Sequence, residues 1–181
     1  MKAVALKVEA DSAPEPERNS RNHVVHPYYY ALVRLPWQLF VTLTFDDPVP
    51  SERKRLSKFY ALLRKLARME HIHFDGLLWC LREENGGRFG RVHFHSLLMG
   101  LPDNRLGGAL CRRVVAEWKR LGGGQADVRV YDPTLDGVRY TLKLSPQDAN
   151  NADGRESAKF GPNDCKLVMG NSLKASLGIE H

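Results

Sequence analysis

Two apolar runs separated by a turn-forming sequence limit most strongly how this chain can fold. Residues 77–85 (LLWCLREEN) and 91–100 (RVHFHSLLMG) are typical of strands, and the sequence Asn85-Gly86-Gly87 between them is typical of a tight turn. We therefore expect an antiparallel hairpin. Because the side chains of a strand alternate between its two faces, such a hairpin determines which residues share one face of a sheet.

The segments on either side of this hairpin complete the predicted fold. Residues 37–45 form a β-branched and aromatic run that predicts a buried strand, and residues 51–71 repeat apolar side chains at helical spacing. A second helix is expected at 104–121 and a short strand at 126–132. The order β-α-β-β-α-β predicts an α+β fold of the ferredoxin-like, split βαβ type. In that fold an antiparallel sheet carries its helices on one face and leaves the other face open for a substrate.

Length and composition fit one domain with its own core. The chain has 181 residues, 43% of them apolar, and it has no apolar run long enough to cross a membrane. Residues 1–26 predict a flexible arm, and residues 27–181 a single domain with a loose segment from about 145 onward. The N-terminus lacks the apolar stretch of a signal peptide, so we expect a cytoplasmic protein with its three cysteines reduced.

The charge balance points to a polyanionic partner. The net charge is +6, and the basic residues fall in clusters at 53–68, 82–91, 112–120 and 139–143. Nucleic acid is the simplest partner for such a distribution, and a solvated basic surface is the alternative.

Two His-x-His pairs compete as metal ligands. His93 and His95 lie inside a predicted strand, where residues two apart face the same side, so both imidazoles can reach one cation. His71 and His73 lie near the end of a predicted helix, where no strand aligns their side chains. We expect a metal at the first pair and none at the second.

A carboxylate on the preceding strand would complete the ligand set. In a hairpin closed by a two-residue turn, paired positions differ by an odd number, so Glu84 shares a face with His93. A bulge at Gly90 would substitute Glu83 as the alternate ligand. Two imidazoles and one carboxylate suit Mn²⁺ or Mg²⁺ and would also hold Zn²⁺. Cys80 leaves a structural zinc site as a lesser alternative.

A candidate nucleophile lies in residues 137–144 (GVRYTLKL). If this run is helical, Tyr140 and Lys143 share a face, and the amine favours the phenolate, which is a nucleophile suited to phosphorus. The same run also alternates as a strand, and from these residues alone the alternation favours the strand with Tyr140 in the core. Tyr131 is a second phenol that we expect to be structural.

Three motifs in order, "FVTLTF", "HFH" and "YTLK", resemble those of the HUH endonucleases. The similarity is to the single-tyrosine rolling-circle replication initiator (Rep) proteins of small phages, plasmids and single-stranded DNA viruses. It covers about residues 37–145 and implies the HUH endonuclease fold with Tyr140 on a helix. Leu144-Ser145-Pro146 follows the motif where family members often have an aromatic residue and a second lysine, which predicts a short helix.

The resemblance implies a metal-dependent enzyme that nicks and joins single-stranded DNA at a specific site. The metal would bind His93, His95 and Glu84. Tyr140 would form a 5′-phosphotyrosine intermediate, and Lys143 would position the DNA or stabilise charge. The expected partners are single-stranded DNA or an origin hairpin and a host helicase, in the cytoplasm of a bacterial host cell. The candidate DNA contacts are Thr42, Thr44, Arg82, Arg91 and Arg139.

Three other functions remain open from the sequence. A strand transferase like the HUH transposases is the nearest enzyme alternative. A non-catalytic nucleic-acid-binding module with the RRM-like fold would have the same order of elements, although the chain has no clear RNP-type run. A zinc-stabilised interaction domain is the third.

Overall fold

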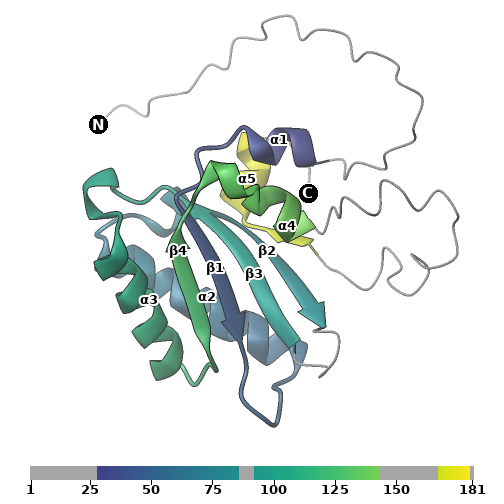
Figure 1. Ribbon diagram of the computed structural model, residues 1–181, viewed down its shortest axis with the longest axis vertical. Helices are drawn as coiled ribbons and strands as arrows, with labels where there is room; N and C mark the ends of the chain where they lie inside the picture. The colour runs from purple at the N-terminus through teal and green to yellow at the C-terminus, as the bar shows by residue number, and fades with distance from the viewer. Residues whose placement is uncertain (1–27, 86–91, 143–166, 180–181) are drawn as a thin grey trace, which may run out of the picture.

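Five antiparallel strands form the centre of the molecule (Figure 1). The computed structural model describes residues 28–85, 92–142 and 167–179. The strands lie side by side in the order β4-β1-β3-β2-β5, and every neighbouring pair is antiparallel. They are β1 (Leu39–Thr44), β2 (Leu78–Asn85), β3 (Val92–Met99), β4 (Ala126–Val130) and β5 (Leu167–Met169).

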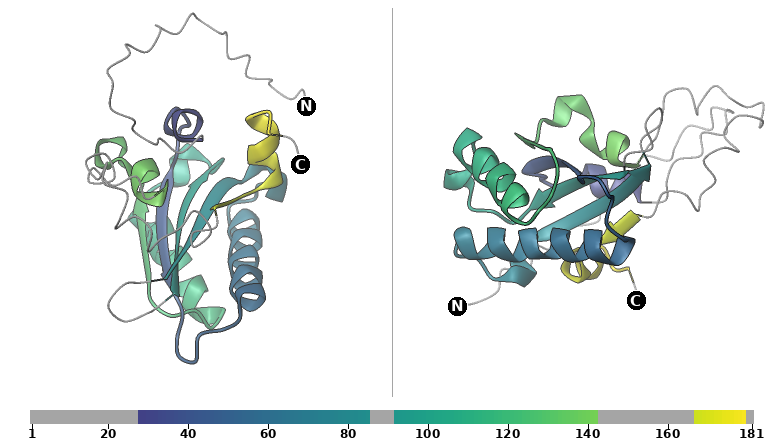
Figure 2. Two further views of the ribbon diagram at one scale, coloured as in Figure 1. Left: turned by 90° about the vertical axis from the view of Figure 1, so that its right-hand side faces the viewer. Right: turned by 90° about the horizontal axis from the view of Figure 1, so that it is seen from below.

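The helices cover both sides of this sheet to different extents. The two long helices pack their apolar sides into one core on the same face of the sheet, and α4 lies on the opposite side from α2 (Figure 2). Short 3₁₀ turns occur at Phe74–Gly76, Asp103–Arg105 and Pro133–Leu135. The helices are α1 (Tyr29–Val33), α2 (Glu52–Met69), α3 (Gly108–Arg120), α4 (Gly137–Leu142) and α5 (Asn171–Ser176).

The predicted α+β, split βαβ-like fold is confirmed. The first four strands and the two long helices follow the expected order β-α-β-β-α-β, with β1 and β3 at the centre of the sheet. The expectation of helices on one face holds for α2 and α3 but not for α4. The reason is a second apolar cluster on the other face of the sheet, which includes Cys80 of β2 and Leu97 of β3. Residues of α4 pack onto this cluster and shield it from solvent.

The larger core lies between the sheet and the two long helices. Phe94 of β3 is fully buried there, with its ring centroid 5.0 Å from that of Phe45 and 6.0 Å from that of Phe59. Trp118 of α3 closes the same cluster. Because Phe94 points into this core, its neighbours His93 and His95 must point to the opposite face of the sheet.

The run at residues 137–144 begins as a helix, as the resemblance implied, and the strand favoured by its alternation is wrong. Val138 and Leu142, four residues apart, share a buried side of α4, and Thr141 is buried with them. Tyr140 lies on the other side of the helix and is 51% exposed. The buried side packs into the second apolar cluster, so tertiary contacts decide the local structure.

The hairpin has the register that the sequence predicts. Glu84 pairs with His93, Arg82 pairs with His95, and the ladder continues to Asn85 and Val92. The odd difference between paired positions is therefore confirmed. Gly86 and Gly87 of the predicted Asn85-Gly86-Gly87 turn lie outside the described residues.

Several other predictions also fall outside the described residues. They concern the N-terminal arm at 1–26, most of the loose segment from 145, and the side chains of Arg91 and Lys143. Within the described ranges, none of the helices is both long and apolar enough to cross a membrane.

Replacing Phe94 with Ala should lower the free energy of unfolding by about 3–5 kcal/mol, because it leaves a cavity between the sheet and α2. Urea denaturation would measure the loss. Phe94→Leu keeps most of the apolar volume and should cost clearly less. Equal losses in the two variants would show that this core does not depend on the aromatic ring.

Candidate metal centre and the tyrosine that faces it

Three side chains from the β2–β3 hairpin converge on one point of the sheet. Oε2 of Glu84 lies 3.3 Å from Nε2 of His93 and 3.2 Å from Nε2 of His95. One ligand atom from each residue lies within 4.8 Å of the other two. Adjacent ligands around a cation with bonds of about 2.1 Å are separated by roughly 3.0–3.4 Å. The three residues, called here the metal centre, therefore fit a single metal ion.

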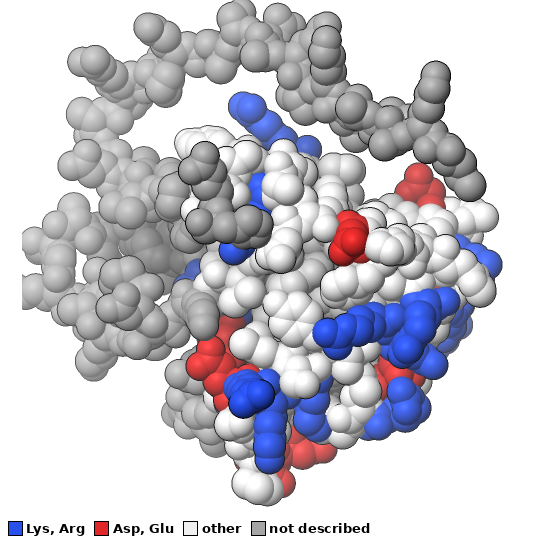
Figure 3. Space-filling model, turned by 180° about the vertical axis from the view of Figure 1, so that it is seen from behind, with Lys and Arg blue, Asp and Glu red and all other residues white. Residues whose placement is uncertain are grey.

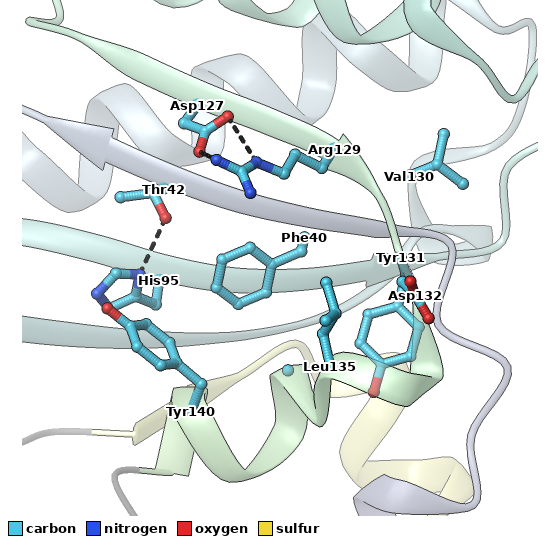
Figure 4. Close-up of a pocket in the computed structure, with 11 residues that line it drawn as sticks. Phe40, Thr42, His95, Asp127, Arg129, Val130, Tyr131, Asp132, Leu135 and Tyr140 are labelled. Carbon is cyan, nitrogen blue, oxygen red and sulfur yellow. Dashed lines mark hydrogen bonds and ion pairs between the residues drawn. The ribbon is translucent and has the colours of Figure 1, made fainter.

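Thr42 of β1 orients one of these ligands. Its Oγ1 lies 3.1 Å from Nδ1 of His95, and the His95 side chain is only 3% exposed (Figure 4). A cation on Nε2 of His95 requires the proton on Nδ1, which then donates to Thr42 Oγ1. Thr42 was predicted as a DNA contact, and the structure gives its hydroxyl this supporting contact with a ligand.

Glu83, the alternate ligand, lies outside the cluster that Glu84 forms with the two histidines. It points to the helical side of the sheet, where Arg55 of α2 donates from Nε to Glu83 Oε2 at 3.2 Å and from Nη2 to Oε1. The strand alternation that places Glu84 beside the histidines places Glu83 opposite to them.

The two competing sites do not form in the part of the chain that the structure describes. His71 and His73 belong to no cluster of three metal-ligating groups there, and His73 is exposed beside Asp75. Cys80 is fully buried, and this burial raises the pKa of its thiol to about 12. Cys80 packs in the second apolar cluster and belongs to no group of three metal-ligating residues among those that the structure describes, so the structural zinc alternative is not supported.

Tyr140 faces the metal centre from α4. Its ring centroid lies 4.8 Å from that of His95, with the two rings almost perpendicular, and its hydroxyl end points toward His95 (Figure 4). Tyr131, the second phenol, is partly buried in the second apolar cluster, and burial raises the pKa of its hydroxyl. Tyr140 is therefore the phenol that the fold brings to the metal centre.

Arg82 connects the hairpin to this tyrosine helix. It is buried beside the metal centre, and its Nη1 donates to the carbonyl of Leu142, the last residue of α4, at 2.5 Å. The sequence predicted Arg82 as a DNA contact. In the structure its guanidinium holds the end of α4 against β2, and its contact with DNA stays a prediction.

The remaining predicted DNA contacts have partners within the protein. Thr44 Oγ1 donates to the carbonyl of Gln125 at 3.1 Å. Arg139 Nε donates to Asp136 Oδ2 at 2.8 Å, and the guanidinium lies 5.6 Å from the centroid of the Tyr29 ring. A contact of either residue with DNA stays a prediction.

Sequence reasoning missed two charged residues near the centre. Asp127 and Arg129 of β4 pair with each other at 2.7 Å and line a pocket that His95 and Tyr140 also line. The alternation in residues 126–132 places both on the outer face of an edge strand, and this signal could have identified them.

Two of the four basic clusters seen in the sequence lie away from the metal centre. Figure 3 shows Lys and Arg side chains gathered on the rear of the molecule, where α2 lies. Arg120 of α3 lowers the pKa of Glu117, chiefly by a hydrogen bond, and Lys65 and Arg68 of α2 add to this effect. The clusters at 53–68 and 112–120 thus meet on the helical side of the sheet.

Loss of any one ligand should weaken metal binding. We expect His93→Ala, His95→Ala and Glu84→Gln each to reduce Mn²⁺ affinity by at least tenfold in calorimetric titration, because each removes one of three ligand atoms. Glu83→Gln is the matched control, since it changes the neighbouring carboxylate on the opposite face. Equal losses in Glu83→Gln and Glu84→Gln would contradict the assigned centre.

Arg82→Met should loosen α4 without removing a metal ligand. We expect a loss of about 1.5–3 kcal/mol in unfolding free energy, because a buried charged donor no longer reaches the Leu142 carbonyl. Hydrogen exchange of the α4 amides should accelerate, whereas Arg139→Ala, which breaks a partly exposed ion pair, should have a smaller effect. Unchanged α4 exchange in Arg82→Met would show that the contact does not hold the helix.

Comparisons with known proteins do not assign a function to this chain. No family model, no curated protein and no solved structure matches this chain. The assignment therefore depends on the chemistry of the metal centre and Tyr140, together with the order of the three sequence motifs.

Proposed function

We propose that this protein is a rolling-circle replication initiator that nicks and joins single-stranded DNA, using Tyr140 as the nucleophile and a divalent cation at the metal centre. The observation that carries the proposal is the distance of 4.8 Å between the ring centroids of Tyr140 and His95. A helix from one part of the chain and a hairpin from another place a phenol beside a metal ligand set. The resemblance of the three motifs to HUH endonucleases supports the same chemistry.

Mn²⁺ or Mg²⁺ is the proposed cofactor. The set of two imidazoles and one carboxylate leaves coordination positions for water and for a phosphate oxygen. Bound there, the ion would supply Lewis-acid polarisation of the scissile phosphate. Thr42 keeps the His95 ring oriented for this role through its contact with Nδ1.

Tyr140 supplies the nucleophile for the transfer step. Tyr140 Oη gives its proton to solvent water and forms a bond to phosphorus, and the bond from phosphorus to the 3′ oxygen breaks. Solvent water returns a proton to that oxygen to give a free 3′-hydroxyl, while the 5′-phosphate stays on the tyrosine. One phosphodiester is exchanged for another, so a 3′-hydroxyl can reverse the step and join strands. The half-exposed position of Tyr140 allows access to a strand outside the sheet.

The alternative functions differ in whether Tyr140 forms a covalent bond to DNA. A strand transferase of the transposase type would use the same tyrosine and metal centre, and would be separated from an initiator by the DNA ends it joins. A non-catalytic module of the RRM-like fold would bind nucleic acid on the same face without a covalent step. The position of Tyr140 beside the metal centre favours an enzyme.

A covalent adduct between protein and DNA is the expected product. We would incubate the protein with Mn²⁺ and a library of random single-stranded DNA labelled at its 3′ end, because the fragment that stays on the tyrosine carries that end, and then look for label on the protein after denaturing electrophoresis. The adduct should disappear in Tyr140→Phe and His95→Ala, because one lacks the nucleophilic oxygen and the other lacks a metal ligand.

Tyr60→Phe, in α2 on the helical side of the sheet, and His71→Ala are the matched controls. Each changes a residue of the same type that lies outside the proposed chemistry, so each should leave the adduct intact. Retention of the adduct in Tyr140→Phe would assign another nucleophile. DNA that is retarded in a native gel but forms no adduct with any divalent metal would instead support the non-catalytic module.

A further inference from the structure

A pocket of about 420 Å³ adjoins the metal centre on the side of His95. His95 and Tyr140 form its wall toward the metal centre, and it extends across β1 and β4 (Figure 4). Small-molecule sites have volumes of about 300–1,000 Å³, so this pocket is large enough for a nucleobase with its sugar.

One aromatic ring provides a flat apolar surface in the pocket. The ring centroid of Phe40 lies 6.0 Å from that of His95, with 25° between the planes, and 5.8 Å from that of Tyr140. Leu135, which is 70% exposed, adds apolar surface on the other side. Phe40 is partly buried, and its ring lines the pocket. Aromatic rings that line a groove bind the bases of single-stranded nucleic acid by stacking.

A charged pair lies along the rim beside this ring. In the sheet register Asp127 is opposite Thr42, and Arg129 is opposite Phe40. Both charged side chains are more than half exposed, at 53% for Asp127 and 68% for Arg129. The pair offers a carboxylate acceptor and guanidinium donors side by side, and both kinds of group recognise base edges.

We propose that this pocket binds one nucleobase of the DNA strand, next to the phosphate at the metal centre. The base would stack on Phe40 and place its polar edge against the Asp127–Arg129 pair. This inference rests on the proposed function, because it requires single-stranded DNA at the metal centre, and it adds a base-binding subsite to that function. His95 lines the pocket and also belongs to the metal centre, so the base and phosphate sites are neighbours.

The test compares DNA with and without bases on protein that cannot cut it. Tyr140→Phe keeps the ring and removes the nucleophilic oxygen. Fluorescence anisotropy would measure its affinity for short labelled homopolymers of deoxyadenylate, deoxycytidylate and thymidylate, and for an abasic oligomer of equal length. At least one base-bearing strand should bind about tenfold more tightly than the abasic strand, which corresponds to one well-stacked base.

Two further substitutions locate this difference in the pocket. Phe40→Leu, made in the same background, keeps an apolar side chain and should remove most of the advantage of the base-bearing strands. Its Mn²⁺ affinity should be unchanged, which shows that the metal centre is intact. Arg129→Ala should reduce the differences among the three homopolymers, whereas Arg112→Ala on α3 removes the same charge elsewhere and should leave them unchanged.

The outcomes separate this inference from the proposed function. Equal affinity for abasic and base-bearing strands would overturn the subsite, as would a base preference that survives Phe40→Leu. A base preference that depends on Phe40, together with the absence of a Tyr140 adduct in the cleavage assay, would support the subsite and overturn the proposed chemistry.

Discussion

The backbone ladder between β2 and β3 is the constraint on which the candidate site depends. It pairs Glu84 with His93 and places His95 two residues further along, so all three ligands point away from the α2 side. A shift of one residue in this pairing would turn the β2 carboxylate to the other face, because side chains alternate with a period of two. The buried Phe94 resists that shift, since a slipped β3 would exchange an aromatic ring for an imidazole in the larger core. The stability of that core and the geometry of the metal centre are thus coupled through one strand.

The second requirement is that α4 stays in place over the outer face. A helix of this length has little stability of its own, so its position must come from tertiary contacts. Val138 and Leu142 provide apolar contacts to the second cluster, and Arg82 ties the last carbonyl of the helix to β2. The position of Tyr140 therefore depends on the apolar contacts of its own helix and on the hydrogen bond from β2. Because Arg82 pairs with His95 in the sheet register, the same part of the hairpin positions both the metal ligands and the helix that carries the phenol.

Local periodicity was sufficient to predict the metal centre but not the helix that faces it. The fold class and the choice of Glu84 follow from alternation and pairing within one hairpin, which are short-range properties of the sequence. The run around Tyr140 satisfies both a strand and a helix pattern, and contacts with β2 and β3 decide between them. The role of Arg82 was not predictable for the same reason, since its acceptor lies sixty residues away along the chain. Asp127 and Arg129 could be assigned to the pocket only after β4 was known to lie beside β1.

The distribution of charge determines how a phosphate could be neutralised at this site. The basic groups of α2 and α3 lie on the helical side, and at physiological ionic strength their field is screened over about 8 Å. On the site face, Arg129 is paired with Asp127 and Arg139 with Asp136, while the Arg82 guanidinium is engaged with a carbonyl. These arginines are therefore poorly placed to balance the charge of a bound phosphate. Among the residues that the structure describes, a cation at the metal centre is therefore the group best placed to supply that charge.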